Sequence, residues 1–396
     1  MQYRIDLKSG NRLSALGYGC MRLPRGASGM VDADKSEKLI LEAIERGVNY
    51  FDTAYIYGGS EQALGEVLRR NDKRREVYIA TKLPHYRVRA HEDFGKYFET
   101  QLGRLKTDYI DYYLLHNVAS LAQLERLRAL GLEEWVARER ERGRIFRFGF
   151  SFHGQSGEFR SLIDANDWDF CQIQYNYLDE HNQAGRAGLE YAASRNIPVI
   201  IMEPLLGGRL AGNVPRGAGG VFRAADSGKT YAAWALRWLW DQPGVTVVLS
   251  GMCAVAQLRE NLETCEEAPP GCLSDAEREV YPRVIASFRE SYKVDCTGCS
   301  YCMPCPMGVN IPGSFEAYNR RYAVGFVAGM QSYIMALGLS HTGKSGSGRQ
   351  CAECGACAKK CPQGIAIPEK LAEAVRRMEP PIIRGAIKII QRVLGK

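Results

Sequence analysis

The chain has 396 residues, of which 45% are hydrophobic and 24% charged, an ordinary composition for a globular protein that can bury a large core. This length exceeds one ordinary domain, although a barrel of about 250 residues counts as one, and it favours two domains. The net charge is +7, and the charged residues behind it are spread along the chain without long runs of one sign, which does not indicate nucleic acid as a partner.

Targeting signals and disulfides are not expected. Residues 1–8 contain no apolar segment of the kind found in signal peptides, and no run approaches the roughly 18 apolar residues of a membrane span. We therefore expect a cytoplasmic protein. The thirteen cysteines are an odd number, and eight of them fall in two short runs, which is typical of metal ligands and not of a disulfide framework.

A repeating pattern of strand and helix follows a predicted N-terminal hairpin over 2–16, which turns at 8–11. The predicted strands are 16–20, 49–53, 77–83, 109–116, 146–151, 170–175, 199–203 and 245–251. The predicted helices are 34–46, 61–70, 92–106, 121–142, 157–165, 184–195, 230–241 and 254–265. Eight alternations within about 250 residues predict a (β/α)8 barrel, and hence the α/β class.

Local signals mark the element boundaries. Asp34 and Glu37 have the spacing of a capping box, which predicts a helix start at Asp34. Gly47 and Gly143 stand where helices should end. The glycine-containing segment 206–229 is too long for a plain connector, and because it follows the seventh strand we interpret it as a flap over a bound cofactor.

Four polar residues stand at or after the ends of predicted strands. Asp52 ends the second strand and Tyr57 lies in the loop that follows it, whereas Lys82 and His116 end the next two apolar runs. A capping aspartate with a surface tyrosine, or a buried ion pair with a core histidine, would account for them structurally. Because carboxyl ends of barrel strands carry active sites, we predict instead that the four face one pocket.

The segments around these residues resemble the aldo-keto reductases. They are Phe-Asp-Thr-Ala followed by Tyr-Gly, Ile-Ala-Thr-Lys, and Asp-Tyr-Tyr-Leu-Leu-His. The resemblance implies a catalytic tetrad of Asp52, Tyr57, Lys82 and His116, a small carbonyl or alcohol substrate, and NAD(P)H as the cofactor. In this scheme Tyr57 supplies the proton, Lys82 lowers its pKa, Asp52 holds Lys82, and His116 orients the substrate.

The same resemblance implies contacts to the nicotinamide. Ser151, Gln174 and Asn176 stand where related enzymes hold the carboxamide group. Met202 occupies the position of the aromatic residue that usually stacks on the nicotinamide ring, and Glu203 follows it. Met202 is predicted to pack on that ring; the alternative is a pocket remodelled for another group.

The adenosine phosphate is expected at the last strand and helix. Gly251, Gln257 and Asn261 lie there, and a helix amino terminus suits an anion. Gly251 and Gln257 replace the basic pair that many family members use for the 2′-phosphate. The resemblance therefore leaves the choice between NADH and NADPH open.

Two cysteine runs occupy the C-terminal third. The second, 351–362, has the bacterial ferredoxin spacing C-x2-C-x2-C-x3-C-P, and the first, 296–306, is one residue shorter before its last cysteine. Zinc sites use two pairs of ligands, not two groups of four, so we predict two [4Fe-4S] clusters. In two-cluster ferredoxins the fourth cysteine of each run ligates the other cluster. The predicted ligand sets are Cys296, Cys299, Cys302 and Cys361 for one cluster, and Cys351, Cys354, Cys357 and Cys305 for the other.

These features divide the chain into a barrel over 1–273 and, over 274–396, a linker helix with a small, mainly helical ferredoxin-like domain. The basic amphipathic segment 382–396 is predicted to be a helix packed on this domain, in preference to a membrane anchor.

Three functions are considered. The first is an oxidoreductase of the aldo-keto reductase type, whose clusters exchange electrons with a redox partner protein or support the active site. Clusters pass single electrons whereas nicotinamide passes a hydride, so a flavin is a further candidate cofactor. The second function considered is therefore a ferredoxin-linked electron-transfer enzyme, which uses a flavin or transfers electrons directly from a cluster to the substrate. The third is a redox-sensing regulatory subunit.

Overall fold

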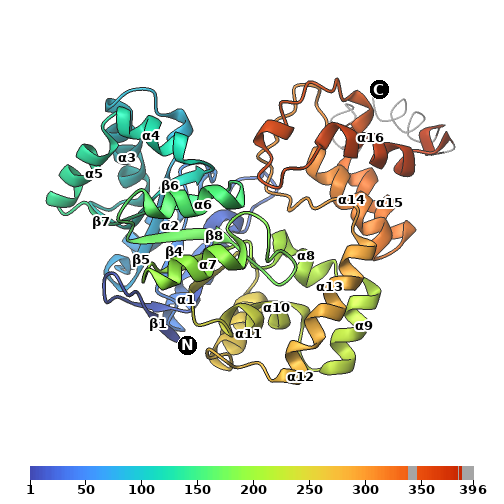
Figure 1. Ribbon diagram of the computed structural model, residues 1–396, viewed down its shortest axis with the longest axis horizontal. Coiled ribbons are helices and arrows are strands. Elements are labelled where there is room, and N and C mark those ends of the chain that lie inside the picture. The colour runs from blue at the N-terminus through green and yellow to red at the C-terminus, as the bar shows by residue number, and fades with distance from the viewer. Residues whose placement is uncertain (338–345, 382, 386–396) are drawn as a thin grey trace. The chain divides into compact units, whose positions relative to one another are not determined.

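The structure is a computed structural model that describes residues 1–337, 346–381 and 383–385 (Figure 1). The chain divides into two compact units. The barrel unit comprises Met1–Pro204 and Ala232–Ser274, and the C-terminal unit comprises Leu205–Tyr231 and Asp275–Lys396. The domain division at residue 274 stays a prediction, and residues 205–231 belong to the same unit as the C-terminal residues.

Eight parallel strands form a closed barrel in the order β10-β3-β4-β5-β6-β7-β8-β9, which confirms the predicted fold. The strands are β3 (Leu16–Gly19), β4 (Tyr50–Asp52), β5 (Tyr78–Leu83), β6 (Ile110–Val118), β7 (Ile145–Phe152), β8 (Phe170–Gln174), β9 (Val199–Met202) and β10 (Val245–Ser250). The predicted hairpin is present as β1 (Tyr3–Ile5) paired antiparallel with β2 (Arg12–Ser14). Large buried side chains from alternate strands, such as Tyr50, Tyr112 and Phe170, fill the interior.

Helices follow the barrel strands because their apolar residues recur at helical spacing. In α1 the buried Leu39, Ile40, Ala43 and Ile44 lie on one face. The helices of this unit are α1 (Ala33–Glu45), α2 (Ser60–Arg70), α3 (Glu92–Leu105), α4 (Leu121–Ala129), α5 (Leu132–Glu141), α6 (Ser156–Asp164), α7 (Gly185–Ser194), α10 (Tyr231–Trp240) and α11 (Val255–Glu266). Short 3-10 turns of the chain are η1 (Cys20–Arg22), η2 (Arg74–Glu76), η3 (His85–Arg87), η4 (Leu206–Gly208), η5 (Gly348–Gln350) and η6 (Ala358–Lys360).

Two local predictions for the barrel were wrong. Asp32, not Asp34, caps α1, because its side chain accepts a hydrogen bond from the backbone of Lys35. The single helix predicted over 121–142 is two helices, α4 and α5. They are separated at Gly131, whose φ of +84° is readily adopted by glycine and ends the first helix.

The C-terminal unit is helical, as predicted. Its helices are α8 (Arg209–Gly212), α9 (Arg216–Ala225), α12 (Asp275–Arg278), α13 (Val280–Ser291), α14 (Ile311–Ala323), α15 (Phe326–Ala336) and α16 (Ile367–Met378). The segment expected to be a long loop therefore contains α8 and α9. It is helical because α9 buries Phe222, which packs edge-on against Tyr281 of α13. The predicted helix 382–396 lies outside the described residues except at 383–385.

None of the helices in the described part of the chain is long and apolar enough to span a membrane.

Buried histidines make the barrel sensitive to acid. His85, His116 and His153 are each at most 7% exposed. Burial lowers the pKa of His153 to about 4, opposed by its hydrogen bond with the amide oxygen of Gln183. Burial likewise lowers the pKa of His85 to about 4. An unfolded histidine titrates near 6.5, so between about pH 4 and 6.5 the unfolded chain binds more protons than the folded one.

We expect acid to destabilise the barrel through these groups. Their contribution to the free energy of unfolding is complete above pH 6.5 and is lost as the pH falls. At pH 5, proton binding to His153 in the unfolded chain alone should lower the free energy of unfolding by about 2 kcal/mol. Urea unfolding can be followed by tryptophan fluorescence at pH 7.5 and at pH 5. Between these two pH values, His153→Gln should lose less of its free energy of unfolding than the unchanged protein does. His181, which is exposed, provides the control substitution His181→Gln. Equal pH dependence of all three proteins would contradict the prediction.

Close packing of α2 on α3 depends on Gly65. A Cβ atom at this position would lie 2.4 Å from the carbonyl carbon of Leu105 and 2.6 Å from the carbonyl oxygen of Arg104. Both are backbone atoms, so relief of the clash requires a shift of one helix against the other.

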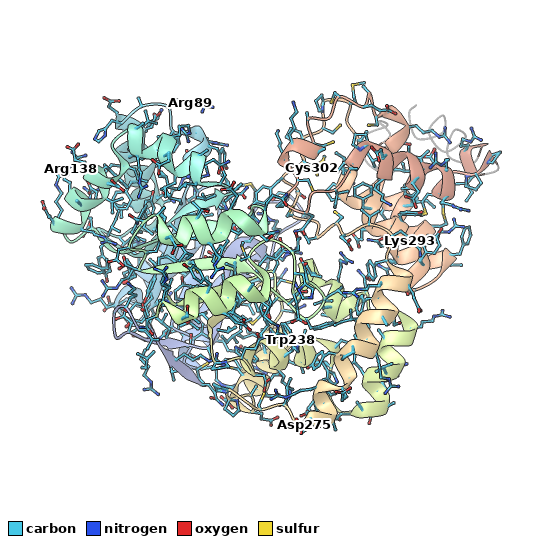
Figure 2. All side chains as sticks on the ribbon, viewed as in Figure 1. Arg89, Arg138, Trp238, Asp275, Lys293 and Cys302 are labelled. Atoms are coloured by element: carbon cyan, nitrogen blue, oxygen red, sulfur yellow. The ribbon has the colours of Figure 1, made fainter. Side chains whose placement is uncertain are left out.

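Gly65→Ala is therefore expected to reduce the free energy of unfolding by about 1–3 kcal/mol. The matched control is Gly103→Ala on α3, where an added Cβ meets nothing within 4 Å, and which should stabilise the helix by up to about 1 kcal/mol. Denaturant unfolding measured by tryptophan fluorescence tests both, because all five tryptophans, including Trp238 in Figure 2, belong to the barrel unit. Equal effects of the two substitutions would refute the packing argument.

Candidate functional site

A buried ion pair lies at the carboxyl ends of β4 and β5. The Lys82 ammonium donates to both carboxylate oxygens of Asp52, at 2.6 and 2.7 Å, and to the backbone oxygen of Thr53 at 2.7 Å. Both side chains are almost completely buried. The amide of Gln172 on β8 adds a hydrogen bond to Asp52. Three acceptors around the ammonium offset the cost of removing it from water.

The tetrad residues predicted from the sequence come together here. The Lys82 ammonium lies 5.1 Å from the centre of the Tyr57 ring. The ring of His116 meets that of Tyr57 nearly at right angles, with centroids 5.9 Å apart. Asp52, Tyr57, Lys82 and His116 therefore form one cluster, and their catalytic roles remain proposals.

Burial controls the protonation of this cluster. It lowers the pKa of His116 well below the usual 6.5, and the Lys82 charge adds to the effect. His116 is therefore neutral at physiological pH and has one nitrogen to donate and one to accept. Burial also lowers the pKa of Lys82 and raises that of Asp52, and in each case the partner's charge opposes the shift.

A second buried network, which the sequence did not predict, supports the loop between β4 and α2. The Glu61 carboxylate is 1% exposed and accepts hydrogen bonds from Thr81, Gln101 and Arg104, at 2.7, 2.7 and 3.0 Å. Arg104 also donates to the backbone oxygen of Tyr55, two residues before Tyr57. Gln101 donates to the backbone oxygen of Lys82. Helix α3 thus holds the segments that carry Tyr57 and Lys82. No motif marks these contacts, because they join residues 19 to 49 positions apart.

Ser151 lies on β7 next to the strand that carries His116. Its hydroxyl accepts from the backbone N–H of Asn117 at 2.8 Å and contacts the backbone oxygen of Leu115 at 3.4 Å. The register of β6 against β7 shifts between Leu115 and Val118, and Asn117 has a φ of +65°. Ser151 therefore stabilises the irregular backbone around His116, besides the nicotinamide contact predicted for it.

Gln174, Asn176 and Met202 lie at the same edge of the barrel. Gln174 donates to the Asp179 carboxylate at 2.7 Å and is paired in register with Met202 of β9. The Asn176 side-chain oxygen accepts from the backbone of Leu178 and Asp179, and its amide nitrogen lies 3.5 Å from the Glu203 oxygen. Asn176 is fully buried, whereas the partly buried Met202 side chain offers an apolar surface on which a planar ring could pack.

The residues predicted to bind the adenosine phosphate surround the start of α11. The Gln257 side chain accepts from the backbone of Cys253, and Asn261 donates to the Ser250 hydroxyl. No side chain caps the amino terminus of α11. A Cβ atom on Gly251 would lie 3.2 Å from the Cβ atom of Arg22, so the aliphatic stem of this side chain lies against the same turn. The sequence did not point to Arg22, because it lies far from α11 along the chain. The uncapped backbone N–H groups at the start of α11 are donors that fit a phosphate.

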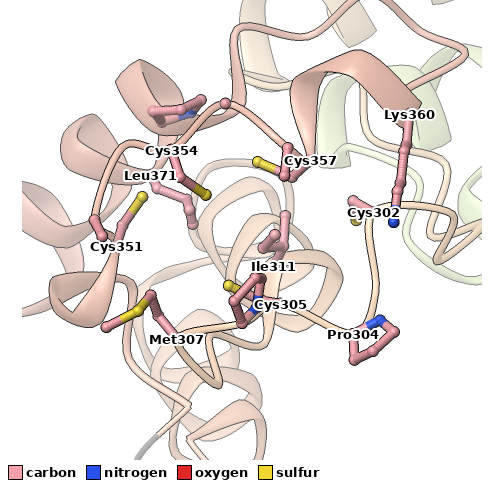
Figure 3. A pocket seen from close by; sticks show the side chains of 15 residues that line it. Cys302, Pro304, Cys305, Met307, Ile311, Cys351, Cys354, Cys357, Lys360 and Leu371 are labelled. Atoms are coloured by element: carbon pink, nitrogen blue, oxygen red, sulfur yellow. The ribbon is translucent and has the colours of Figure 1, made fainter.

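Two hollows in the C-terminal unit are lined by the cysteines of the two runs (Figure 3). The first measures about 500 Å³, counting the solvent at its mouth, and is lined by Cys302, Cys305, Cys351, Cys354 and Cys357. The second measures about 320 Å³ and is lined by Cys296, Cys299, Cys302 and Cys361. The fourth cysteine of each run thus lines the hollow of the other run. The crossed ligand sets stay a prediction.

The two runs repeat the same backbone conformation. In each, the residues immediately before and after the second cysteine have positive φ, +73° and +64° at Gly298 and Ser300, and +52° and +71° at Glu353 and Gly355. Such turns direct successive N–H groups into a concave site that suits an anionic iron-sulfur cluster. Ser300 and Glu353 adopt this conformation at a cost that glycine does not have.

An internal repeat, missed in the sequence, continues beyond each run. Cys305-Pro-Met-Gly and Cys361-Pro-Gln-Gly both close with a hydrogen bond from the glycine N–H to the cysteine oxygen. Each is followed by an Ile-Pro pair that begins a helix, α14 in the first copy and α16 in the second. The spacing of 56 residues between the two Cys-Pro pairs was the available signal.

Comparisons with known proteins agree with this division. The 4Fe-4S dicluster domain model matches residues 295–367, and the Aldo/keto reductase family model matches residues 15–270. Among curated relatives, aldo-keto reductase str7 of Strobilurus tenacellus is 32% identical over 50% of this chain and 60% of its own length. Methylglyoxal reductase YeaE of Escherichia coli is 29% identical over 67% of this chain and 90% of its own length.

A solved aldo-keto reductase from Klebsiella pneumoniae, in complex with NADPH, superposes with a TM-score of 0.59, covering 72% of this chain and 96% of that one at 23% identity. Since the family model matches well over half of the sequence, the chain belongs to the aldo/keto reductase family and carries a 4Fe-4S dicluster domain at its C-terminal end.

Proposed function

We propose that this protein reduces a small carbonyl compound, or oxidises the corresponding alcohol, with NAD(P)H bound at the barrel. The observation that carries the proposal is the position of the Lys82 ammonium, which is bound by Asp52 and faces the Tyr57 ring 5.1 Å away. A buried cation beside a phenol favours the phenolate, which is the form that Tyr57 takes after giving up its proton.

The protein's part in the reaction is to move a proton and stabilise charge. When bound, the nicotinamide supplies the hydride that the carbonyl carbon receives. Tyr57 donates its hydroxyl proton to the carbonyl oxygen, and the Lys82 ammonium stabilises the resulting phenolate. Asp52 holds Lys82 in place. Neutral His116 donates a hydrogen bond to the substrate oxygen and fixes its orientation.

Several features support the nicotinamide cofactor. The related enzyme from Klebsiella pneumoniae binds NADPH. The uncapped start of α11 offers backbone N–H donors and the positive end of the helix dipole to a phosphate. Ser151, Gln174, Asn176 and Met202 are proposed to bind the nicotinamide end. Gly251, Gln257 and Asn261 are proposed to bind the adenosine end.

We further propose that the C-terminal unit holds two [4Fe-4S] clusters, which supply one-electron exchange when bound. The ligand sets are those predicted from the spacing, and the cysteine lining of the two hollows supports them. The repeated left-handed turns support them as well. The flavin-linked enzyme, the redox-sensing subunit and the cytoplasmic location stay hypotheses.

The barrel chemistry is tested with Tyr57→Phe. Loss of the proton donor should lower kcat for aldehyde reduction by about 100-fold or more, because general-acid catalysis contributes that much. The Kd for NADPH should stay within about twofold. Tyr55→Phe is the matched control, because Tyr55 lies in the same loop with its ring under Arg104. Equal loss of kcat and cofactor binding, or an equal effect of Tyr55→Phe, would count against Tyr57 as the donor.

The cluster assignment is tested with Cys354→Ser. The anaerobically purified protein should contain about eight iron atoms per chain, and the variant should lose iron and visible absorbance. Cys253→Ser, at an exposed cysteine outside the runs, should leave the iron content unchanged. Full iron content in Cys354→Ser would show that Cys354 is not a ligand.

A further inference from the structure

The first hollow opens at an exposed surface. Of the eight run cysteines, all of which the structure describes, only Cys354 is exposed. Met307, another lining residue, is 46% exposed, and the lining residues Pro304 and Pro306 are exposed as well. Figure 3 shows Met307 on the same side of this hollow as Cys351 and Cys354. Lys360, which also lines this hollow, lies across it, beside Cys302. We call the exposed residues around the hollow, Met307, Cys354 and Lys360 with its sequence neighbour Lys359, the exchange face.

The positive charge of the exchange face comes from two adjacent lysines. Lys359 and Lys360 are exposed, and neither forms an ion pair within the described ranges. Lys360 lines the first hollow. Glu353 is the one acidic residue of this run, so its side chains other than the cysteines carry a net charge of +1.

The rest of the C-terminal part of the sequence also has a positive net charge. Residues 275–396 contain 17 Lys and Arg against 10 Asp and Glu, whereas residues 1–274 contain 35 of each. The whole net charge of +7 is therefore carried by the C-terminal part. A field of this kind attracts a negatively charged protein and speeds its association.

The second hollow differs from the first in its charge and in the exposure of its cysteines. Its lining contains no Lys, Arg, Asp or Glu, and its cysteines are buried or partly buried. Electron transfer falls steeply with distance, so a partner docked beside the exposed hollow has the shorter path. Shallow, weakly bound and electrostatically guided contacts are typical of redox partners.

We propose that the exchange face is the docking surface for a small acidic one-electron carrier protein of the ferredoxin class. This rests on the cluster-holding part of the proposed function and not on the barrel chemistry. In each encounter one electron leaves the reduced C-terminal unit, which is oxidised, and enters the oxidised carrier, which is reduced. No atom or proton is transferred between the two proteins.

The test is a stopped-flow experiment on the full-length protein. The clusters are reduced chemically with dithionite, excess reductant is removed, and oxidised plant-type ferredoxin is mixed in at low and high salt. Lys359→Gln/Lys360→Gln should slow the reaction about tenfold at low salt and little at high salt, because screening removes the attraction. Arg376→Gln/Arg377→Gln is the control: it removes the same charge from α16, at exposed residues that line neither hollow.

Equal slowing by the two double variants, or no slowing by the lysine pair, would overturn the docking face. Basic cytochrome c should react no more slowly with the lysine variant than with the unchanged protein. If the lysine variant loses iron, Met307→Glu provides the second test, since it places a repelling charge on the same face outside the cysteine set. Because no nicotinamide or carbonyl compound is present, the result does not depend on whether the barrel has the proposed activity.

Discussion

The buried pair of Lys82 and Asp52 is the constraint on which the barrel site depends. Two charges removed from water are costly unless every remaining donor and acceptor is satisfied. Here the ammonium has three oxygen acceptors, and Gln172 supports the carboxylate from across the barrel. These contacts require β4, β5 and β8 in their observed register. The network around Glu61 then holds the neighbouring loop, so that the phenol faces the cation.

Much of the barrel could be predicted because its signals are local. Apolar runs ending in a lone polar residue marked the strand ends, and all eight strands lie where the pattern placed them. The supporting contacts could not be predicted, since Glu61, Gln101 and Arg104 are ordinary helix residues in the sequence. Asp32 and Asp34 are equally good caps by residue type, and the hydrogen bond to Lys35 distinguishes them only in three dimensions.

The C-terminal unit shows a different limit of prediction. Cysteine spacing predicted which residues gather around each hollow, because thiolate ligands follow strict patterns. It did not predict the exposure of Cys354 or the charge beside it, which depend on how helices pack behind the loops. Segment 205–231 also escaped prediction. Its glycines favoured a loop, yet the apolar contacts of Phe222 in α9 override the weak helix propensity of its neighbours.

The pairing of distant cysteines has a consequence for biosynthesis. Cys361 lines the hollow formed by the first run, and Cys305 lines the hollow formed by the second. Neither hollow is complete in a nascent chain that ends between the two runs. The barrel sequence, in contrast, is translated before either cysteine run. Both hollows are therefore completed only after Cys361 has been translated, which is later than the whole barrel sequence.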